Sequence, residues 1–248
     1  MYPGKDFFLM GSDYVFPRIA NEIITNMVKD KLKRKSMEMY IPLGGTEVDA
    51  SFKAIQSFMP NGGIIFNTLN GDTNISFFKK YKELGMTPDK WPTLSVSISE
   101  VEIQDIGKDL LKDHFACWNY FMTIDSDINR KFINSFQKKY GTDRLINDPM
   151  ECAYNSVHLW AKAVTSAGTT DLAAVRLAAM GQTFDAPQGK VSLDSNHHLT
   201  KWIRIGKVND KGLFDIVYAS PQGVRAEPYS PYYPALANLK CDWTGIGK

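Results

Sequence analysis

The segment FFLMGSDYVFPRIAN (7–21) decides the fold, because it joins an apolar strand to a helix through a polar turn. Residues 7–10 are all apolar, as in a strand that is covered on both faces. Pro17 suits the first turn of the helix that follows. The turn itself carries three side chains that water or a ligand can reach: Asp13, Tyr14 and Phe16. The segment therefore predicts one βα unit of a parallel sheet, with a recognition turn at its edge.

The same alternation of strand and helix continues through the first 122 residues. Further strands are expected at 37–44, 62–72, 91–99 and 114–122, and further helices at 49–58 and 74–85. Strands that alternate with helices at this spacing are typical of a parallel sheet. The predicted fold class is therefore α/β.

The pattern changes at Asp125, where three helices follow without a strand between them, at 126–141, 148–168 and 170–181. The expected N-caps are Ser126 or Asp127, then Asp148-Pro149, then Thr170-Asp171. Apolar stripes give each helix a face to bury, and for the second helix the stripe is Val157, Trp160, Ala161 and Val164. Antiparallel strands are then predicted over 189–220, with NDKG (209–212) as a hairpin turn.

Composition excludes several classes of protein. The chain has 248 residues, of which 44% are hydrophobic, and its formal charge is 29 − 27 = +2, so no strong field draws it to nucleic acid. Three distant cysteines without a CxxC pair argue against a disulfide framework or a zinc site. No apolar run reaches the roughly 18 residues of a membrane span. The start MYPGKD has no signal-peptide core, so the chain is either cytosolic or lacks its original start.

Catalytic signatures are absent from the sequence. It has no GxSxG, P-loop, GxGxxG after a strand, or HExxH motif, and no nucleophile–base pair is visible. His197-His198 without a nearby third ligand is more typical of a loop than of a metal site. His158 is interpreted as a partly buried packing residue. The sequence thus predicts no catalytic residue, no metal and no cofactor, and a protein that is not an enzyme.

In an open parallel sheet, ligands collect outside the carboxyl ends of the strands. The polar and aromatic residues expected at that edge are Asp13, Tyr14, Phe16, Asn70, Asp72, Ser99 and Glu100. Aromatic walls with a few fixed donors and acceptors suit a small neutral or zwitterionic molecule. Simpler roles stay open, because Asp13 could cap the helix and Phe16 could pack against it. Their convergence at one sheet edge favours a binding site.

Six stretches extend these observations: FLMGSDYVFPRIAN, IIFNTLNGDTNISFFKKYKELG, LSVSISEVEI, WNYFMTID, NDPMECAYNSVHLWAKAV and GQTFDAPQGKVSLDSNHHLTKWIRIGKV. Over about 5–234 the chain resembles the urea- and short-chain-amide-binding proteins of ABC transporters. These belong to the branched-chain amino-acid type of type I periplasmic binding protein, which also includes an amide-sensing regulator. The resemblance implies that Tyr14 and Phe16 wall the ligand pocket, that Asn70 and Asp72 form the adjacent polar loop, and that SISE supplies Glu100.

The resemblance also implies a domain plan with two α/β lobes. Residues 1–122 and 186–234 would form the second lobe, a Rossmann-like parallel sheet with flanking helices, while 123–185 supply only helices of the first lobe and 235–248 form a tail. Family members begin with a signal peptide and a first-lobe sheet, neither of which is present here. We therefore expect the helices at 126–180 either to associate with another chain through their apolar faces or to be mobile and aggregation-prone.

Three functions follow as hypotheses. The first is a substrate-binding protein, or its remnant, for urea or a short-chain amide, which would meet an ABC permease if exported. The second is a cytosolic amide-sensing regulator with the same fold. The third is an amide-processing enzyme, which the missing nucleophile–base pair disfavours. Nucleic acid and membrane insertion are not expected. The full-length family is periplasmic or extracellular, and the location of this product is left open.

Overall fold

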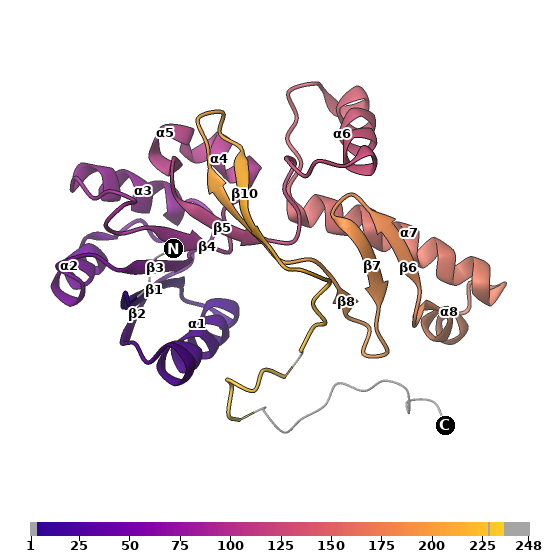
Figure 1. Ribbon diagram of the computed structural model, residues 1–248, viewed down its shortest axis with the longest axis horizontal. Coiled ribbons are helices and arrows are strands. Elements are labelled where there is room, and N and C mark those ends of the chain that lie inside the picture. Colours follow the sequence, from indigo (N-terminus) through magenta and orange to yellow (C-terminus); the bar gives the residue numbers. More distant parts are fainter. Residues whose placement is uncertain (1–3, 228, 236–248) are drawn as a thin grey trace. The chain divides into compact units, whose positions relative to one another are not determined.

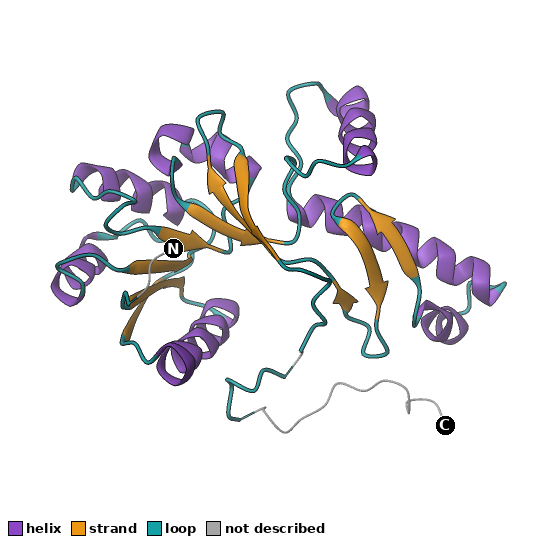
Figure 2. Cartoon of the chain, viewed as in Figure 1, coloured by secondary structure: helices purple, strands orange, loops and turns teal. Residues whose placement is uncertain are grey.

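Parallel βα units make up the first part of the chain in the computed structural model, which describes residues 4–227 and 229–235 (Figure 1). The strands are β1 (Phe7–Ser12), β2 (Ser36–Ile41), β3 (Ile64–Thr68), β4 (Thr93–Ser95) and β5 (Phe115–Trp118). β1 pairs in parallel with β2 and β3, β3 with β4, and β4 with β5. Figure 2 shows helices flanking these strands. The predicted α/β class with a parallel sheet is therefore confirmed.

The helices of this region are α1 (Val15–Met27), a π-helix η1 (Val28–Leu32), α2 (Asp49–Phe58), α3 (Thr73–Glu83), α4 (Glu100–Ile106) and α5 (Lys108–Leu111). The helix that follows β1 changes to a π-helix at Val28 and ends at Leu32, because the next residue, Lys33, has a left-handed backbone with φ 52°. The sequence reading missed α4 and α5. A signal for α4 existed, because Ser99 and Glu102 have the spacing of a capping box.

The chain is divided into two compact units. Unit 1 holds the described residues within 1–117, 207–213 and 229–238, and unit 2 holds those within 118–206 and 214–228. Aromatic side chains fill the core of unit 1: Phe52 and Phe77 stack with ring centroids 4.9 Å apart, and Phe77 meets Phe78 edge-on at 5.2 Å. This core fixes α2 and α3 against the sheet, and with them the loops that precede α3.

Unit 2 contains α6 (Asp127–Tyr140), α7 (Asp148–Ala167), α8 (Leu172–Ala179) and a three-stranded antiparallel sheet of β6 (Thr183–Ala186), β7 (Gly189–Leu193) and β8 (Leu199–Thr200). Ser126 and Asp171 cap α6 and α8 as predicted, since their side chains accept from Asn129 N and Ala174 N. The predicted cap of α7 was wrong by one residue, because the side chain of Asn147 accepts from Met150 N. The Asp148 side chain therefore does not cap α7.

The buried face of α7 differs from the predicted stripe. Val157 and Trp160 are 64% and 57% exposed, and Ala161 is exposed as well. The opposite side is buried instead and carries Glu151, Asn155, Leu159 and Ala163. Leu159 packs there with Ala186 and Val191 of the β6–β7 hairpin, which lies along α7 in Figure 1. The correction has a physical reason: Gln188 of the hairpin donates to Glu151, so this carboxylate is hydrogen-bonded on the buried face.

The last two strands, β9 (Arg204–Val208) and β10 (Phe214–Ala219), extend the main sheet, whose order is β10-β9-β5-β4-β3-β1-β2. The predicted hairpin turn NDKG is confirmed, because Asn209 N donates to Leu213 O and Gly212 N to Asn209 O. The compact units group β6, β7 and β8 with the helices, whereas the resemblance-based plan placed 186–234 with the sheet lobe. That plan of lobes stays a prediction about a longer protein.

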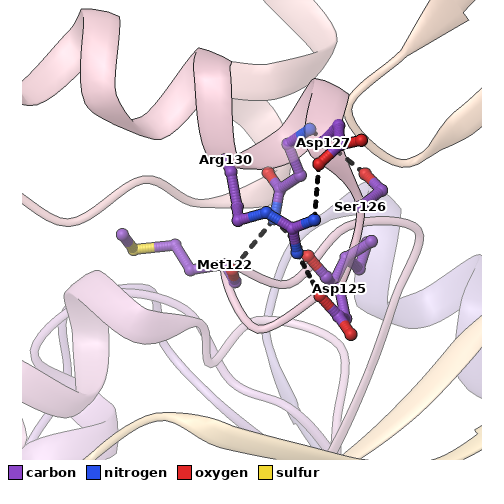
Figure 3. Close-up of polar contacts among 7 residues, drawn as sticks. Met122, Asp125, Ser126, Asp127 and Arg130 are labelled. Atoms are coloured by element: carbon purple, nitrogen blue, oxygen red, sulfur yellow. Dashed lines mark hydrogen bonds and ion pairs between the residues drawn. The ribbon is translucent and has the colours of Figure 1, made fainter.

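The turn before α6 is built around Arg130, as Figure 3 shows. Its guanidinium contacts the carboxylates of Asp125 and Asp127, and the Asp127 contact is 2.6 Å long. This hydrogen bond lowers the pKa of the Asp127 carboxyl.

Part of the predicted tail, 236–248, lies outside the described residues. No helix within 4–227 and 229–235 is long and apolar enough to cross a membrane.

Candidate functional site

The candidate site lies at the carboxyl edge of the parallel sheet in unit 1. Strand register brings Gly11 beside Thr68 and Asn67 beside Ser95, so β1, β3 and β4 end at the same edge. α1, α3 and α4 each begin within a few residues of these strand ends, which directs backbone N–H groups of their first turns to that edge. All seven predicted site residues lie in these three loops or helix starts. Parallel pairing thus places three distant stretches of sequence together.

Two aromatic rings stand at the start of α1. Tyr14 is the N-cap residue in an extended conformation, and Tyr14 and Phe16 are 36% and 44% exposed, with ring centroids 6.3 Å apart. A Cβ atom on Gly11 would lie 2.9 Å from Pro17 Cβ, so only glycine lets α1 start this close to β1. The turn therefore holds two partly exposed rings on a tightly packed base, as a pocket wall requires.

Asp13 is held in an ion pair. Its Oδ1 lies 2.8 Å from Arg18 Nε and 2.7 Å from a terminal nitrogen of the same guanidinium. The Arg18 guanidinium also lies 4.0 Å from the centre of the Tyr40 ring, and the Tyr40 hydroxyl donates to Glu38 at 2.7 Å. Burial and this hydrogen bond raise the pKa of Tyr40 to about 12. The sequence reading named Asp13 but missed Arg18 and Tyr40.

The β3–α3 loop places Asn70 and Asp72 at the same edge. Asn70 N donates to Ser12 Oγ at 2.9 Å, and Asn70 Nδ2 donates to Thr68 O at 3.1 Å, so the residue ties β1 to β3. Asp72 is exposed and occupies the N-cap of α3, but its side chain makes no capping bond. Ser12 is fully buried, and sequence reasoning took it as part of the strand. A serine hydroxyl at the end of an apolar strand could have indicated that Ser12 contacts the neighbouring loop.

A buried network of polar side chains supports this loop. Asn67 Nδ2 donates to Asn74 Oδ1 at 2.9 Å and to Ser95 Oγ at 3.1 Å, while Asn67 Oδ1 accepts from Leu69 N. Leu69 O accepts in turn from Asn74 Nδ2 and from Ser97 Oγ. Each contact fixes the backbone between β3 and α3, so these side chains set the loop conformation rather than face a ligand.

Ser99 and Glu100 differ from the other predicted site residues because both are buried. Ser99 is the N-cap of α4, where its N–H donates to Glu102 Oε2 at 2.8 Å and its hydroxyl contacts the same oxygen. The hydroxyl is thus engaged in capping. Glu100 has no exposed surface, so a carboxylate lies beneath the edge rather than on it. The structure places both residues at the predicted edge, with Ser99 occupied locally.

The described residues offer little support for metal binding or for catalysis by histidine. No group of three or more His, Cys, Asp or Glu side chains there could hold a metal ion. His158, expected to be partly buried, is exposed and stacks on Phe184 at 4.7 Å. His114 is buried before β5, where Thr93 N donates to its Nδ1 at 3.2 Å. Burial lowers the pKa of His114 to about 3, so its imidazole stays neutral.

A second set of buried polar groups lies in unit 2. Asp148 Oδ1 accepts from Asn119 N and Tyr120 N, and Arg204 donates to Asn119 O at 2.5 Å. Arg204 also donates to Gln188 O at 2.7 Å, while Glu151 accepts from the backbone and side chain of Gln188. Burial raises the pKa of both Asp148 and Glu151. These groups join segments that are far apart in sequence, and their role is structural.

The chain is similar to several known proteins. The model of the family described as periplasmic binding protein domain matches residues 2–235. A protein called limonene hydroxylase from Geobacillus stearothermophilus is 33% identical over 123 residues, which are 50% of this chain and 23% of that protein. Leu/Ile/Val-binding protein homolog 6 of Brucella melitensis is 24% identical over 164 residues, 64% of this chain and 40% of that protein.

A solved structure shows the same fold. It is the solute-binding protein of an ABC transporter from Rhodopseudomonas palustris BisB5, in complex with 3,4-dihydroxy benzoic acid, and it aligns with a TM-score of 0.77 at 19% sequence identity. The alignment covers 89% of this chain and 61% of that one. The chain therefore spans less than half the length of the two curated relatives and about three fifths of the solved structure.

Proposed function

Because the chain belongs to the periplasmic binding protein domain family, we propose that it is the ligand-binding part of an ABC-transporter solute-binding protein for urea or a short-chain amide. The family consists of binding proteins rather than enzymes, in agreement with the sequence prediction. The partners of the whole protein would be the small ligand and a transporter permease, and its location would be periplasmic or extracellular. Residues 1–122 and 186–234 would correspond to the second lobe of a two-lobed protein.

One observation carries the choice of ligand class. The Tyr14 and Phe16 rings share the sheet edge with the Asn70 amide, on a loop that internal hydrogen bonds hold in place and that also carries the exposed Asp72. The Asp13 carboxylate at this edge is matched by the Arg18 cation. A compact ligand with amide-like donors and acceptors and no net charge suits such a surface. The seven predicted residues are therefore proposed as ligand contacts, with Ser99 acting through the start of α4.

Calorimetric titration of the chain with urea, acetamide and leucine tests the proposal. We expect urea or acetamide to bind more tightly than leucine, because the Tyr14 and Phe16 rings and the hydrogen-bonded Asn70 loop suit a small planar amide. A turnover assay for ammonia release from urea and acetamide should show no activity. Tighter binding of leucine, or no binding of either amide, would contradict the proposed function.

Replacing Tyr14 by Ala should weaken binding of the preferred amide by roughly 1–3 kcal/mol, which is the usual cost of leaving polar partners unpaired. Tyr218→Ala is a matched control, because that tyrosine is 50% exposed and lies in unit 2. The two titrations, run alongside wild type, give the measurement. If Tyr14→Ala leaves the titration curve unchanged, Tyr14 serves packing instead.

The expected self-association of the helical segment is a separate prediction. Val157, Trp160 and Leu172 are 64%, 57% and 81% exposed, and Phe132 lines an adjacent cleft, whereas Val175 is buried. Exposed apolar groups of this size favour contact with a second chain. Sedimentation velocity should show concentration-dependent association of wild type that Trp160→Lys reduces. A wild-type monomer at all concentrations would show that these faces do not associate.

A further inference from the structure

The β1–α1 turn contains a charge pair that sequence reading did not connect. Asp13 precedes Tyr14 and Phe16, and Arg18 follows them, so the pair closes the turn that carries both rings. Two nitrogens of Arg18 lie 2.8 and 2.7 Å from the same oxygen of Asp13. The hydrogen bond to Asp13 raises the pKa of the Arg18 guanidinium, so the guanidinium stays protonated at neutral pH. The turn therefore carries one negative and one positive charge in contact.

Other contacts keep Arg18 in this position. Its guanidinium lies 4.0 Å from the centre of the Tyr40 ring, on the neighbouring strand β2. The Tyr40 hydroxyl donates to Glu38, and Asp13 N donates to Ile41 O at 2.7 Å. Strand β2 thus holds both members of the pair, the aspartate through its backbone and the arginine through an aromatic face. A flexible surface arginine has no such support.

We propose that Arg18 is a specificity determinant of the site, because it cancels the charge of Asp13 and so favours neutral ligands over cations of the same shape. The inference rests on the proposed function and deepens it. Asp72 and Glu100 also bring carboxyl groups to this edge, one exposed and one buried. Without Arg18, the Asp13 carboxylate would lose its cationic partner beside Tyr14. Cations would then be attracted to the Asp13 carboxylate, whose charge Arg18 balances in the native protein.

Urea and guanidinium are suitable probes, because both are planar and similar in size and they differ by one charge. The quantity to measure is the ratio of their affinities, since loss of fold weakens both ligands and leaves the ratio unchanged. We expect wild type to prefer urea. Arg18→Met should shift the ratio toward guanidinium by about tenfold, the order expected for one unit charge several ångströms away in a partly solvated site. Asp13→Asn should shift it in the opposite direction, because Arg18 then stands uncompensated.

Arg130→Met is a matched control from unit 2. Arg130 pairs with Asp125, also five residues earlier in the chain, and with Asp127 (Figure 3). Its replacement removes the same kind of ion pair from a residue that belongs to none of the three loops of the candidate site, so the affinity ratio should stay at the wild-type value. A second check is ionic strength. Raising salt from about 0.01 M to about 1 M shortens the screening length about tenfold and should shrink the Arg18→Met shift.

The outcomes separate this inference from the function on which it rests. Opposite shifts for Arg18→Met and Asp13→Asn, with none for Arg130→Met, support it. If wild type binds urea or acetamide and Arg18→Met weakens both probes equally, Arg18 is only a structural residue and the inference fails. If wild type binds neither amide, the proposed function fails and the specificity role fails with it. Arg18→Gln, which keeps a polar group, should reproduce the methionine result if charge is the cause.

Discussion

Lowering the pH from about 7 to about 5 is expected to reduce the free energy of unfolding of unit 1 by about 2 kcal/mol. The cause is His114, which is 2% exposed and packs between the rings of Phe78 and Tyr81. Burial lowers its pKa from 6.5 to about 3, although the carboxylate of Asp113 opposes the shift. In the unfolded chain the His114 imidazole becomes protonated near pH 6.5, whereas in the folded unit it stays neutral at that pH. Stability present above that pH is therefore lost progressively between pH 6.5 and about 3.

Hydrogen exchange on peptides from β4 and β5, measured at several pH values, follows this loss within unit 1. His114→Gln should remove most of the pH dependence, whatever its own effect on stability. His158→Gln, at an exposed position on α7, should keep the wild-type pH dependence. A wild-type unit whose protection stays constant from pH 7 to 5 would show that His114 takes up a proton in the folded state.

Replacing Arg204 by Met should destabilise unit 2 by roughly 3–5 kcal/mol, the cost of breaking a buried ionic network by removing one partner. Arg204 is 9% exposed, donates to two backbone carbonyls and attracts the carboxylates of Glu151 and Asp148. Its loss removes this cation from both buried carboxylates, of which Asp148 retains the attraction of Lys201. Because burial already raises the pKa of both carboxyls, they take up protons as the pH falls. The loss in the free energy of unfolding caused by Arg204→Met should therefore be smaller at low pH than at neutral pH.

Chemical denaturation followed by hydrogen exchange in α7 measures this change. Arg225→Met is a suitable control, because its side chain is 66% exposed and lies 3.5 Å from Asp194. Such a surface pair contributes little, so the control should stay within about 1 kcal/mol of wild type. An equal effect of the two variants would mean that Arg204 is not the central cation of unit 2.

The parallel sheet could be predicted because its signals are local. Residues 7–10 form a short apolar run before a turn and a helix, and the strands at 37–44 and 62–72 are likewise followed by helical patterns, so no distant contact is needed to recognise these units. The meeting of the site residues at one edge follows directly from parallel pairing. The sequence reading was therefore reliable wherever the pattern and the strand direction alone determine position.

The parts that sequence reading missed depend on partners far along the chain. The buried face of α7 carries Glu151 and Asn155, and the apolar periodicity pointed to Val157 and Trp160 instead. Glu151 is accommodated because Gln188, 37 residues later, supplies its donors. Arg18 was overlooked for the same reason, since it depends on the Tyr40 ring from a neighbouring strand. A local pattern contains no information about such partners.

The discontinuity of unit 1 has a consequence for the order of events during protein synthesis. Residues 207–213 complete this unit, although the rest of its sheet and helices comes from the first 117 residues. Val208 N donates to His114 O, Asp113 N donates to Val208 O, and Lys207 pairs with Asp113 at 2.6 Å. A ribosome adds about 5–20 residues per second. About 90 further residues must therefore be synthesised after residue 117 before residues 207–213 can pair with this part of the unit. During that interval β5 lacks its neighbouring strand β9, so one edge of the early sheet stays unpaired.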